Sequence, residues 1–343
     1  MPQQSKKHIL VIRLSAMGDV AMSVPVIKAA TEQHPDLKIT VLTKSFFKPF
    51  FRNLKDVEVI TADVKGKHKG TIGLYKLARG INKNFKFYAI ADLHNVLRSK
   101  VLKQFISCNR FISIDKGRAE KRQLTSGKLF KQLKTTHQRY ADVFSGLGYP
   151  IDLSKPSFPN KVDLNDKLKR ILGDRKQAVV GIAPFAAHDA KMYPLHLMED
   201  VLERISATYK VVLFGGGKNE IAILNRWAQR YKNTVSIAGK LTLDEELDIV
   251  SNLDVMLSMD SGNAHIAAML GIKVITIWGV THPYAGFAPF HQPEDYALLA
   301  NRAAFPLVPT SVYGNKYPEG YKAASASIPV QHILDKVSTV ISK

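Results

Sequence analysis

Cysteine is almost absent from the sequence, since Cys108 is the only one in 343 residues. One thiol cannot form an intramolecular disulfide or a zinc site of several cysteines, which fits a reducing compartment. The N-terminal region also lacks a long hydrophobic run, because His8–Ile12 is bounded by Lys7 and Arg13. This run is too short for the core of a signal peptide or for a membrane span, so we expect a cytoplasmic protein.

Acidic residues are scarce: the chain has 29 Asp and Glu against 49 Lys and Arg, a formal net charge of +20. This charge predicts an anionic partner, and nucleic acid, a phosphorylated glycolipid and a membrane surface all fit it. Residues 98–139 have few acids among many bases, which favours a docking patch over a merely solvated surface. The bases of this region are Arg98, Lys100, Lys103, Arg110, Lys116, Arg118, Lys121, Arg122, Lys128, Lys131, Lys134 and Arg139.

Signatures of several enzyme classes are missing. The chain has no histidine pair at metal-ligand spacing with carboxylates, and no Asp-x-Asp after a predicted strand, so we predict no bound metal. It has no Gly-x-Ser-x-Gly nucleophile motif. The glycines at 215–217 do not form a Walker loop, since Asn219 follows Lys218, nor a Gly-x-Gly-x-x-Gly motif, since Glu220 takes the last place.

Short apolar runs alternate with helical patterns, and this predicts an α/β protein whose parallel sheets are covered on both faces. The predicted strands are residues 9–12, 37–43, 57–62, 87–93, 110–115, 178–183, 210–214, 234–238, 255–259 and 273–278. The predicted helices are residues 20–30, 70–82, 195–209, 220–231, 243–252, 266–270 and 330–341.

The length of the chain favours two domains over one. The stretch 148–159 is polar, aperiodic and contains proline, as a linker does. We therefore predict one doubly wound domain over residues 1–160 and a second over residues 161–328. The last predicted helix, 329–343, can pack back on the first domain.

Residues 254–279 read as a strand, a tight turn, a short helix and a second strand. Ser261 can cap this helix, and Gly262 after it lets a ligand approach the backbone closely. Such a helix start is an anion site. His265, one turn further, is either a packing histidine or a ligand-binding residue of that site.

Other polar residues follow predicted strands, at the sheet edge where doubly wound domains bind ligands. The Gly215–Gly217 run is either a plain turn or a ligand contact. Glu220 either accepts hydrogen bonds from ribose hydroxyls or favours its own helix start. Asp19 is more readily explained as a helix cap than as a general base. Lys191 either neutralises a diphosphate or lies exposed in solvent.

Taken in order, five segments resemble the bacterial lipopolysaccharide heptosyltransferases, glycosyltransferase family 9, and the resemblance extends over residues 8–287. The segments are Arg13–Val20, Ala91–Ser99, Lys191–Pro194, Gly215–Glu220 and Asp260–His265. The resemblance implies a GT-B fold of two doubly wound Rossmann-like domains facing across a cleft, the N-terminal one for the acceptor and the C-terminal one for the nucleotide sugar.

The resemblance further implies inverting, metal-independent transfer of a heptose from ADP-heptose, with no cofactor beside this donor substrate. The implied acceptor is the lipopolysaccharide inner core or a related anionic glycolipid, reached by peripheral contact with the inner face of the cytoplasmic membrane. No nucleic-acid partner is expected. The rival hypotheses are a catalytically silent binder of nucleotide sugars or nucleic acid, and a two-Rossmann nucleotide-sugar epimerase.

The family's catalytic carboxylate falls on Asp19, its diphosphate contacts on Lys191, Ser261 and Gly262, and its ribose-binding acid on Glu220. The full set of expected donor-binding residues is Lys191, Glu220, Leu241 beside the adenine, Asp260, Ser261, Gly262 and His265. The expected acceptor-binding residues are Arg13, Ser15, His94, Arg98, Arg118 and Arg122. His94 stands where a glycine is common, and residues 303–327 lack the cysteines often seen there, so the acceptor's identity stays open.

Overall fold

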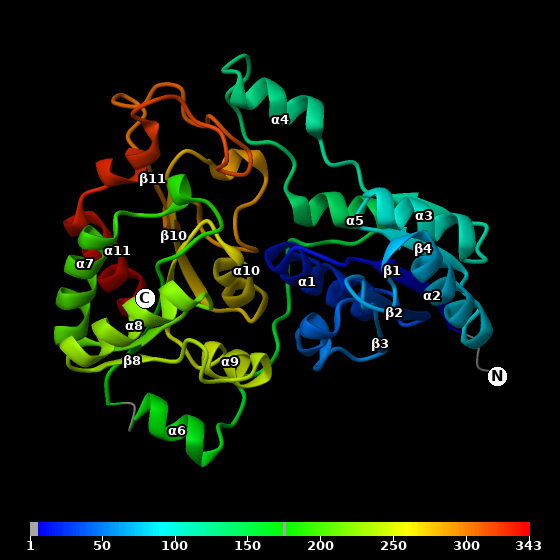
Figure 1. The fold of residues 1–343 in the computed structure, drawn as a ribbon, viewed down its shortest axis with the longest axis horizontal. Coiled ribbons are helices and arrows are strands. Elements are labelled where there is room, and N and C mark those ends of the chain that lie inside the picture. The colour runs from blue at the N-terminus through cyan, green and yellow to red at the C-terminus, as the bar shows by residue number, and fades with distance from the viewer. Residues whose placement is uncertain (1–5, 174–175) are drawn as a thin grey trace. The chain divides into compact units, whose positions relative to one another are not determined.

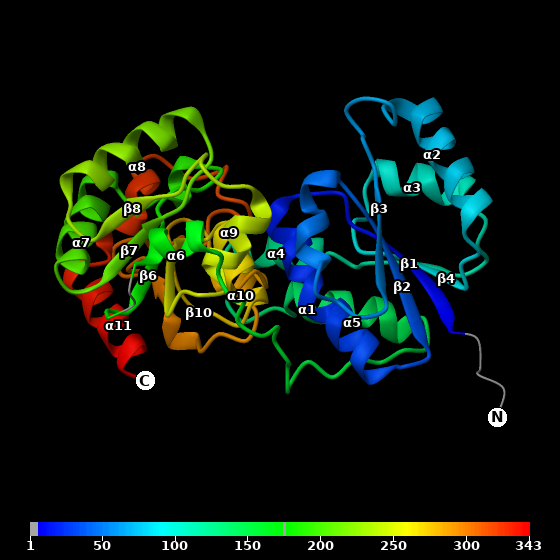
Figure 2. The same cartoon turned by 90° about the horizontal axis from the view of Figure 1, so that it is seen from below.

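The computed structural model describes residues 6–173 and 176–343, which form two compact units (Figures 1 and 2). The first comprises the chain up to Lys116 together with Thr136–Ser157, and the second comprises Gly117–Thr135 together with Phe158–Lys343. Each unit has its own parallel sheet. The predicted α/β class with two parallel, doubly wound sheets is confirmed.

The sheet of the first unit has the strand order β3-β2-β1-β4-β5. All of its neighbouring strands are parallel, and Ile9 of the central strand lies opposite Ile39 on one side and Ala89 on the other. Figure 2 shows α1 and α5 on one face of this sheet and α2 and α3 on the other. The elements are β1 (Lys7–Ile12), α1 (Met17–Gln33), β2 (Leu37–Thr43), η1 (Ser45–Phe51), β3 (Val57–Thr61), α2 (Gly70–Asn84), β4 (Ala89–Asp92), α3 (Leu97–Phe105), β5 (Phe111–Ser113) and α5 (Thr136–Gly146).

The sheet of the second unit has the strand order β11-β10-β9-β6-β7-β8, again parallel. Its core gathers aliphatic residues of these strands with Trp227 and Tyr193. The elements are α4 (Arg118–Thr125), α6 (Asp166–Leu172), β6 (Val179–Ala183), η2 (Asp189–Lys191), α7 (Leu195–Thr208), β7 (Lys210–Leu213), α8 (Lys218–Arg230), β8 (Thr234–Ser236), α9 (Leu243–Val250), β9 (Val255–Met259), α10 (Gly262–Met269), β10 (Lys273–Trp278), η3 (Pro283–Ala285), η4 (Glu294–Tyr296), β11 (Ala297–Leu299), η5 (Tyr321–Ser327) and α11 (Val330–Ser342).

The division into units differs from the predicted domains in three places, the smallest being residues 158–160, which belong to the second unit. Residues 117–135 belong to the second unit, because Leu124 and Leu133 pack with Ala285 and the Leu133 N–H donates to Tyr284 O at 3.0 Å. The closing helix α11 also belongs to the second unit, whereas the sequence left open that it packs back on the first domain. Its buried residues, among them Ile333, belong to the core of the second unit, and the helix packs against α7.

No helix of the described residues is both long and apolar enough to cross a membrane.

Candidate active site

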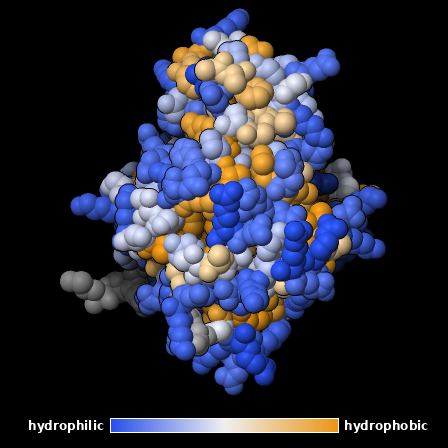
Figure 3. Space-filling model, turned by 90° about the vertical axis from the view of Figure 1, so that its left-hand side faces the viewer, coloured by the Kyte–Doolittle hydropathy of each residue, from blue (hydrophilic) through white to orange (hydrophobic). Residues whose placement is uncertain are grey.

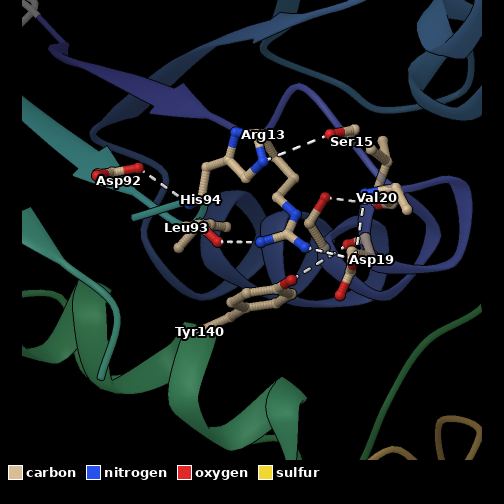
Figure 4. A network of polar contacts seen from close by, with 10 residues as sticks. Arg13, Ser15, Asp19, Val20, Asp92, Leu93, His94 and Tyr140 are labelled. Atoms are coloured by element: carbon tan, nitrogen blue, oxygen red, sulfur yellow. Dashed lines mark hydrogen bonds and ion pairs between the residues drawn. The ribbon is translucent and has the colours of Figure 1, made fainter. Parts of the chain in front are cut away.

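Each unit contains a polar network where strands of its sheet end. In the first unit the network begins at Arg13, the residue after β1, which is buried. Its Nη2 lies 2.6 Å from Asp19 Oδ2, and its Nη1 donates to Leu93 O at 2.6 Å (Figure 4). The guanidinium carbon lies 5.8 Å from the centre of the Tyr140 ring. Arg13 therefore ties the start of α1 to the loop after β4.

Asp19 is the third residue of α1, and its Oδ2 also accepts the Ala16 N–H at 3.1 Å. The carboxylate thus helps to cap the helix, as the sequence analysis favoured, although Ala16 and not Asp19 occupies the N-cap position. Both contacts use Oδ2, and within residues 6–173 and 176–343 Oδ1 has no hydrogen-bond partner. The side chain is partly exposed. Asp19 can therefore cap α1 with one oxygen and present the other.

Tyr140 of α5 holds the backbone of the same turn. Its hydroxyl donates to Asp19 O at 3.3 Å, and the side chain is completely buried. Burial raises the pKa of Tyr140 above its usual value, so the hydroxyl stays protonated and remains a donor. Tyr140 is not among the predicted site residues, since no local pattern relates it to Asp19, 121 residues earlier.

The loop after β4 is shaped by Asp92, which is fully buried. Asp92 Oδ1 accepts the N–H groups of His94 and Asn95, each at 2.9 Å, and Oδ2 accepts the Ser113 hydroxyl at 3.2 Å. Asp92 is not among the predicted site residues, although a carboxylate at the end of an apolar strand is a usable signal for a buried, hydrogen-bonded acid.

His94 lies close to Arg13 and Ser15 in this network (Figure 4). Its Nε2 is 3.5 Å from Ser15 Oγ, and the side chain is buried. Burial first, and then the charge of Arg13, lower the pKa of His94 to about 3. The imidazole is therefore neutral at neutral pH, and its Nδ1 has no hydrogen-bond partner among the described residues.

The predicted acceptor-binding residues fall in both units. Arg13, Ser15 and His94 meet in the network of the first unit, and Arg98 is exposed in the first turn of α3. Arg118 and Arg122 are exposed on α4, which belongs to the second unit. The basic region 98–139 is therefore divided between two units and does not form a surface of one domain.

The network of the second unit joins Lys191 to Asp260. The Lys191 Nζ lies 2.9 Å from Asp260 Oδ2, and Thr281 Oγ1 donates to the same oxygen at 2.9 Å. Asp260 follows β9 and is buried, whereas Lys191 ends η2 and is less buried. The acid therefore fixes the position of the ammonium, which has three donors and uses one of them here. Thr281, 21 residues after Asp260, is not among the predicted site residues.

Ser261 occupies the N-cap position of α10 with an extended backbone, φ −145° and ψ 176°. The prediction that its side chain caps the helix is wrong, because its Oγ pairs with Ser258 Oγ at 3.1 Å instead. The Ser261 side chain therefore makes no cap hydrogen bond to this helix. The helix start at Gly262 thus keeps the character of an anion site. His265, one turn further, is buried in α10.

Glu220 caps the start of α8. Its Oε2 accepts the N–H groups of Gly216 and Gly217 at 2.8 and 3.2 Å, which is the helix-start role that the sequence analysis had left open beside ribose binding. The Gly215–Gly217 run is accordingly a turn closed by Glu220. Leu241 lies half-buried between β8 and α9.

The segment 303–327, without an assigned role from sequence, packs against η2. The Ser325 hydroxyl donates to Met192 O at 2.8 Å. Gly314 has a φ of +82°, and a Cβ on it would lie 2.3 Å from Lys191 Cγ. Only glycine fits there without displacing the lysine. This segment therefore holds the aliphatic part of Lys191.

Within the described residues, no group of three or more His, Cys, Asp or Glu side chains is placed to hold a metal ion. The predicted metal independence stays a prediction.

Comparison with known proteins gives one consistent result. The model of glycosyltransferase family 9 (heptosyltransferase) matches residues 74–306, more than half of the chain. The chain is 25% identical to lipooligosaccharide heptosyltransferase 2 of Haemophilus influenzae, over 98% of its own length and 100% of that protein.

Solved structures show the same fold. A glycosyl transferase family 9 protein from Veillonella parvula superposes with a TM-score of 0.75 at 17% identity, over 99% of this chain and 98% of that one. The E. coli heptosyltransferase WaaC with ADP-2-deoxy-2-fluoro heptose gives a TM-score of 0.67 at 15% identity, over 97% and 99%.

Proposed function

Since the chain belongs to glycosyltransferase family 9, the heptosyltransferases, we propose that it transfers a heptose from ADP-heptose to the lipopolysaccharide inner core or a related anionic glycolipid. The relative from H. influenzae is named a lipooligosaccharide heptosyltransferase, which supports the acceptor class. The WaaC structure with ADP-2-deoxy-2-fluoro heptose supports the donor. The net charge of +20 fits an anionic acceptor.

In the proposed reaction, the acceptor hydroxyl attacks the anomeric carbon of the heptose and Asp19 takes its proton. The bond from that carbon to the β-phosphate oxygen breaks, and ADP leaves with the electron pair. Attack opposite the leaving group inverts the anomeric configuration. The observation that carries this assignment is the partly exposed Asp19 with Oδ1 unpartnered among the described residues, while Arg13 and Ala16 hold Oδ2.

We assign the donor to the second unit. Lys191 and the start of α10 at Ser261 and Gly262 would stabilise the negative charge on the departing diphosphate without a metal. Asp260 would act through Lys191 by positioning its ammonium. This arrangement resembles an oxyanion hole, in which each donor contributes about 3 kcal/mol to the transition state.

The remaining donor contacts are assigned to the nucleoside. The Oε1 of Glu220 is not used in the two bonds that close the glycine turn, so it remains suited to accept a ribose hydroxyl. Leu241 would form the wall beside the adenine, and His265 would shape the pocket from within α10.

We assign the acceptor to Arg13, Ser15, His94 and Arg98 of the first unit, while the contacts predicted for Arg118 and Arg122, on α4 of the second unit, stay predictions. Guanidinium groups suit phosphates and acidic sugars because they bind them bidentately. We further propose a cytoplasmic protein in peripheral contact with the inner face of the cytoplasmic membrane, where a lipid-linked acceptor would be reached. No nucleic-acid partner and no cofactor beside the donor are proposed.

Replacing Asp19 with Asn tests the catalytic assignment. General-base catalysis contributes about 10²- to 10⁴-fold, so we expect kcat to fall by that factor while ADP-heptose affinity stays near wild type. ADP release with a core-saccharide acceptor measures the first, and calorimetric titration with ADP-heptose the second. The matched control is Glu32→Gln, an exposed carboxylate of the same helix, which should leave both unchanged. Unchanged turnover in Asp19→Asn would refute the role of base.

A thermal-shift series with ADP-, GDP- and UDP-sugars tests the donor. We expect stabilisation by ADP-heptose, because a ligand that binds only the folded state raises the melting temperature. No response to any ADP compound would contradict the donor assignment. Conversion of ADP-heptose without an acceptor would instead indicate an epimerase.

A further inference from the structure

A pocket of about 430 Å³ lies in the second unit, and its lining includes neither Lys191 nor Asp260. It is lined by residues 124–127 and Phe130 on one side and by residues from 306–310 and 316–318 with Arg302 on the other. Both sides belong to the same unit, so the pocket is complete within it. None of the proposed donor or acceptor contacts uses these lining residues.

The two sides are joined by specific contacts. The guanidinium carbon of Arg302 lies 3.6 Å from the centre of the Phe130 ring, and its Nε donates to Val308 O at 2.9 Å. Phe130 also packs against His282 and Tyr284, with ring centres 5.2 and 5.0 Å away. These contacts hold the groove in shape before any partner binds, which reduces the entropy that binding costs.

Large apolar side chains nevertheless remain exposed on its rim. Leu307 is 60% exposed, and Phe130 and Tyr317 are each 41% exposed. In Figure 3, hydrophobic residues come to the surface of the second unit in separate areas among hydrophilic ones. An exposed apolar cluster beside a preformed groove indicates a contact surface.

The charge around the groove is mostly positive. Arg122 and Lys128 lie beside it on the 117–135 segment, and Lys316 lies in its lining, all three exposed. The lining residues include no Asp or Glu, and the acids nearest to them in sequence are Glu120 and Glu319. A second copy of this chain would bring the same cations against themselves, and this repulsion disfavours a self-complementary dimer. A partner complementary to the rim in charge and polarity is therefore an anionic surface into which aliphatic and aromatic side chains can insert.

We propose that this rim, Phe130, Leu307, Lys316 and Tyr317, docks the second unit on a bilayer that contains anionic phospholipid. Leu307 and the two aromatic rings enter the headgroup boundary, and the cations contact lipid phosphates. Leu307 beside several prolines offers an aliphatic surface, which fits lipid better than the stacked bases of a nucleic acid. The inference deepens the proposed function, since it rests on a lipid-linked acceptor.

The test is co-sedimentation with phosphatidylcholine vesicles, with and without phosphatidylglycerol. We expect binding only to the anionic vesicles and a loss of about tenfold in the Leu307→Gln/Tyr317→Ser variant, since burial of one large apolar side chain changes an equilibrium constant by roughly that factor or more. The Lys316→Gln variant should lose about fivefold at low salt. The matched control, Ile72→Gln/Tyr75→Ser, removes exposed apolar residues of the first unit and should bind like wild type.

Three outcomes would overturn the proposal: equal binding of the rim variant and wild type, an equal loss in the control, or a rim variant that changes only oligomeric state or oligonucleotide binding. Thermal melting establishes that each variant is folded. Turnover of a water-soluble, delipidated acceptor should stay at the wild-type level in the rim variant. If wild type transferred no heptose to any acceptor, the proposed function would be refuted. The vesicle-binding comparison would still show whether the rim is the docking surface.

Discussion

The two units each pair one cation with one acid at the end of a sheet, but they expose opposite partners. In the first unit the Arg13 side chain is 6% exposed and that of Asp19 28%. In the second unit the Lys191 side chain is 14% exposed and that of Asp260 7%. The first pair therefore presents a carboxylate, which can accept a proton, and the second presents an ammonium, which can bind an anion. The same type of ion pair thus serves two different chemical tasks.

Replacing Lys191 with Met should have the largest effect of the changes in the second unit. We expect kcat/KM to fall by about 10²- to 10³-fold, because one donor to the departing diphosphate is lost. Steady-state kinetics with varied ADP-heptose measure this. Replacement of Lys218, which opens α8 beside the glycine turn and is exposed, by Met is the control and should change kcat/KM little. Wild-type kinetics in Lys191→Met would contradict the assignment of Lys191 to the departing diphosphate, and with it the contrast between the two ion pairs.

The stability of the two pairs should also differ. Lys191→Met leaves a buried carboxylate with Thr281 alone, and breaking a buried pair costs about 3 kcal/mol. The double variant Lys191→Met/Asp260→Asn removes the uncompensated charge and should recover much of that loss. In the first unit, Asp19→Asn should cost less, about 1 kcal/mol, because the pair is partly exposed and the amide oxygen of the new asparagine can still accept a hydrogen bond from the buried Arg13. Urea unfolding of the four proteins measures these differences. If Lys191→Met and the double variant lost the same free energy of unfolding, Lys191 and Asp260 would not be energetically coupled.

The free energy of unfolding measured over a pH series should show the smallest of these effects. It reports on the first unit, through His94. The folded-state pKa of His94, about 3, is below its unfolded value of about 6.5, so only the unfolded state gains a proton as the pH falls between them. Folding therefore loses stability in this range. Between about pH 6 and pH 4, the stability of wild type should fall by about 2 kcal/mol relative to His94→Gln.

The control for the pH series is His196→Gln, which removes an exposed histidine of α7. This variant should follow the wild-type curve. A constant difference between wild type and His94→Gln across the pH range would contradict the neutral, buried state of His94.

Much of the sheet could be predicted from sequence, because buried parallel strands are continuous apolar runs. The strands β2, β9 and β10 have the predicted bounds, 37–43, 255–259 and 273–278. Strand β11 was missed because it has only three residues. Helix α4 was missed because its sequence is strongly polar, and its place depends on Leu124 packing with distant Ala285.

The sequence by itself determined the α/β class, the repeated strand-and-helix order and the positions of Asp19, Lys191 and Asp260 in the segments that follow strands, since these follow from local patterns of apolar residues. The tertiary structure decided which partner of each ion pair is the more exposed one. Arg13 is covered by Leu93 and Tyr140, and the chain around Lys191 is held by Gly314, all distant in sequence. Exposure is a property of packing between such segments, and so no local pattern contains it.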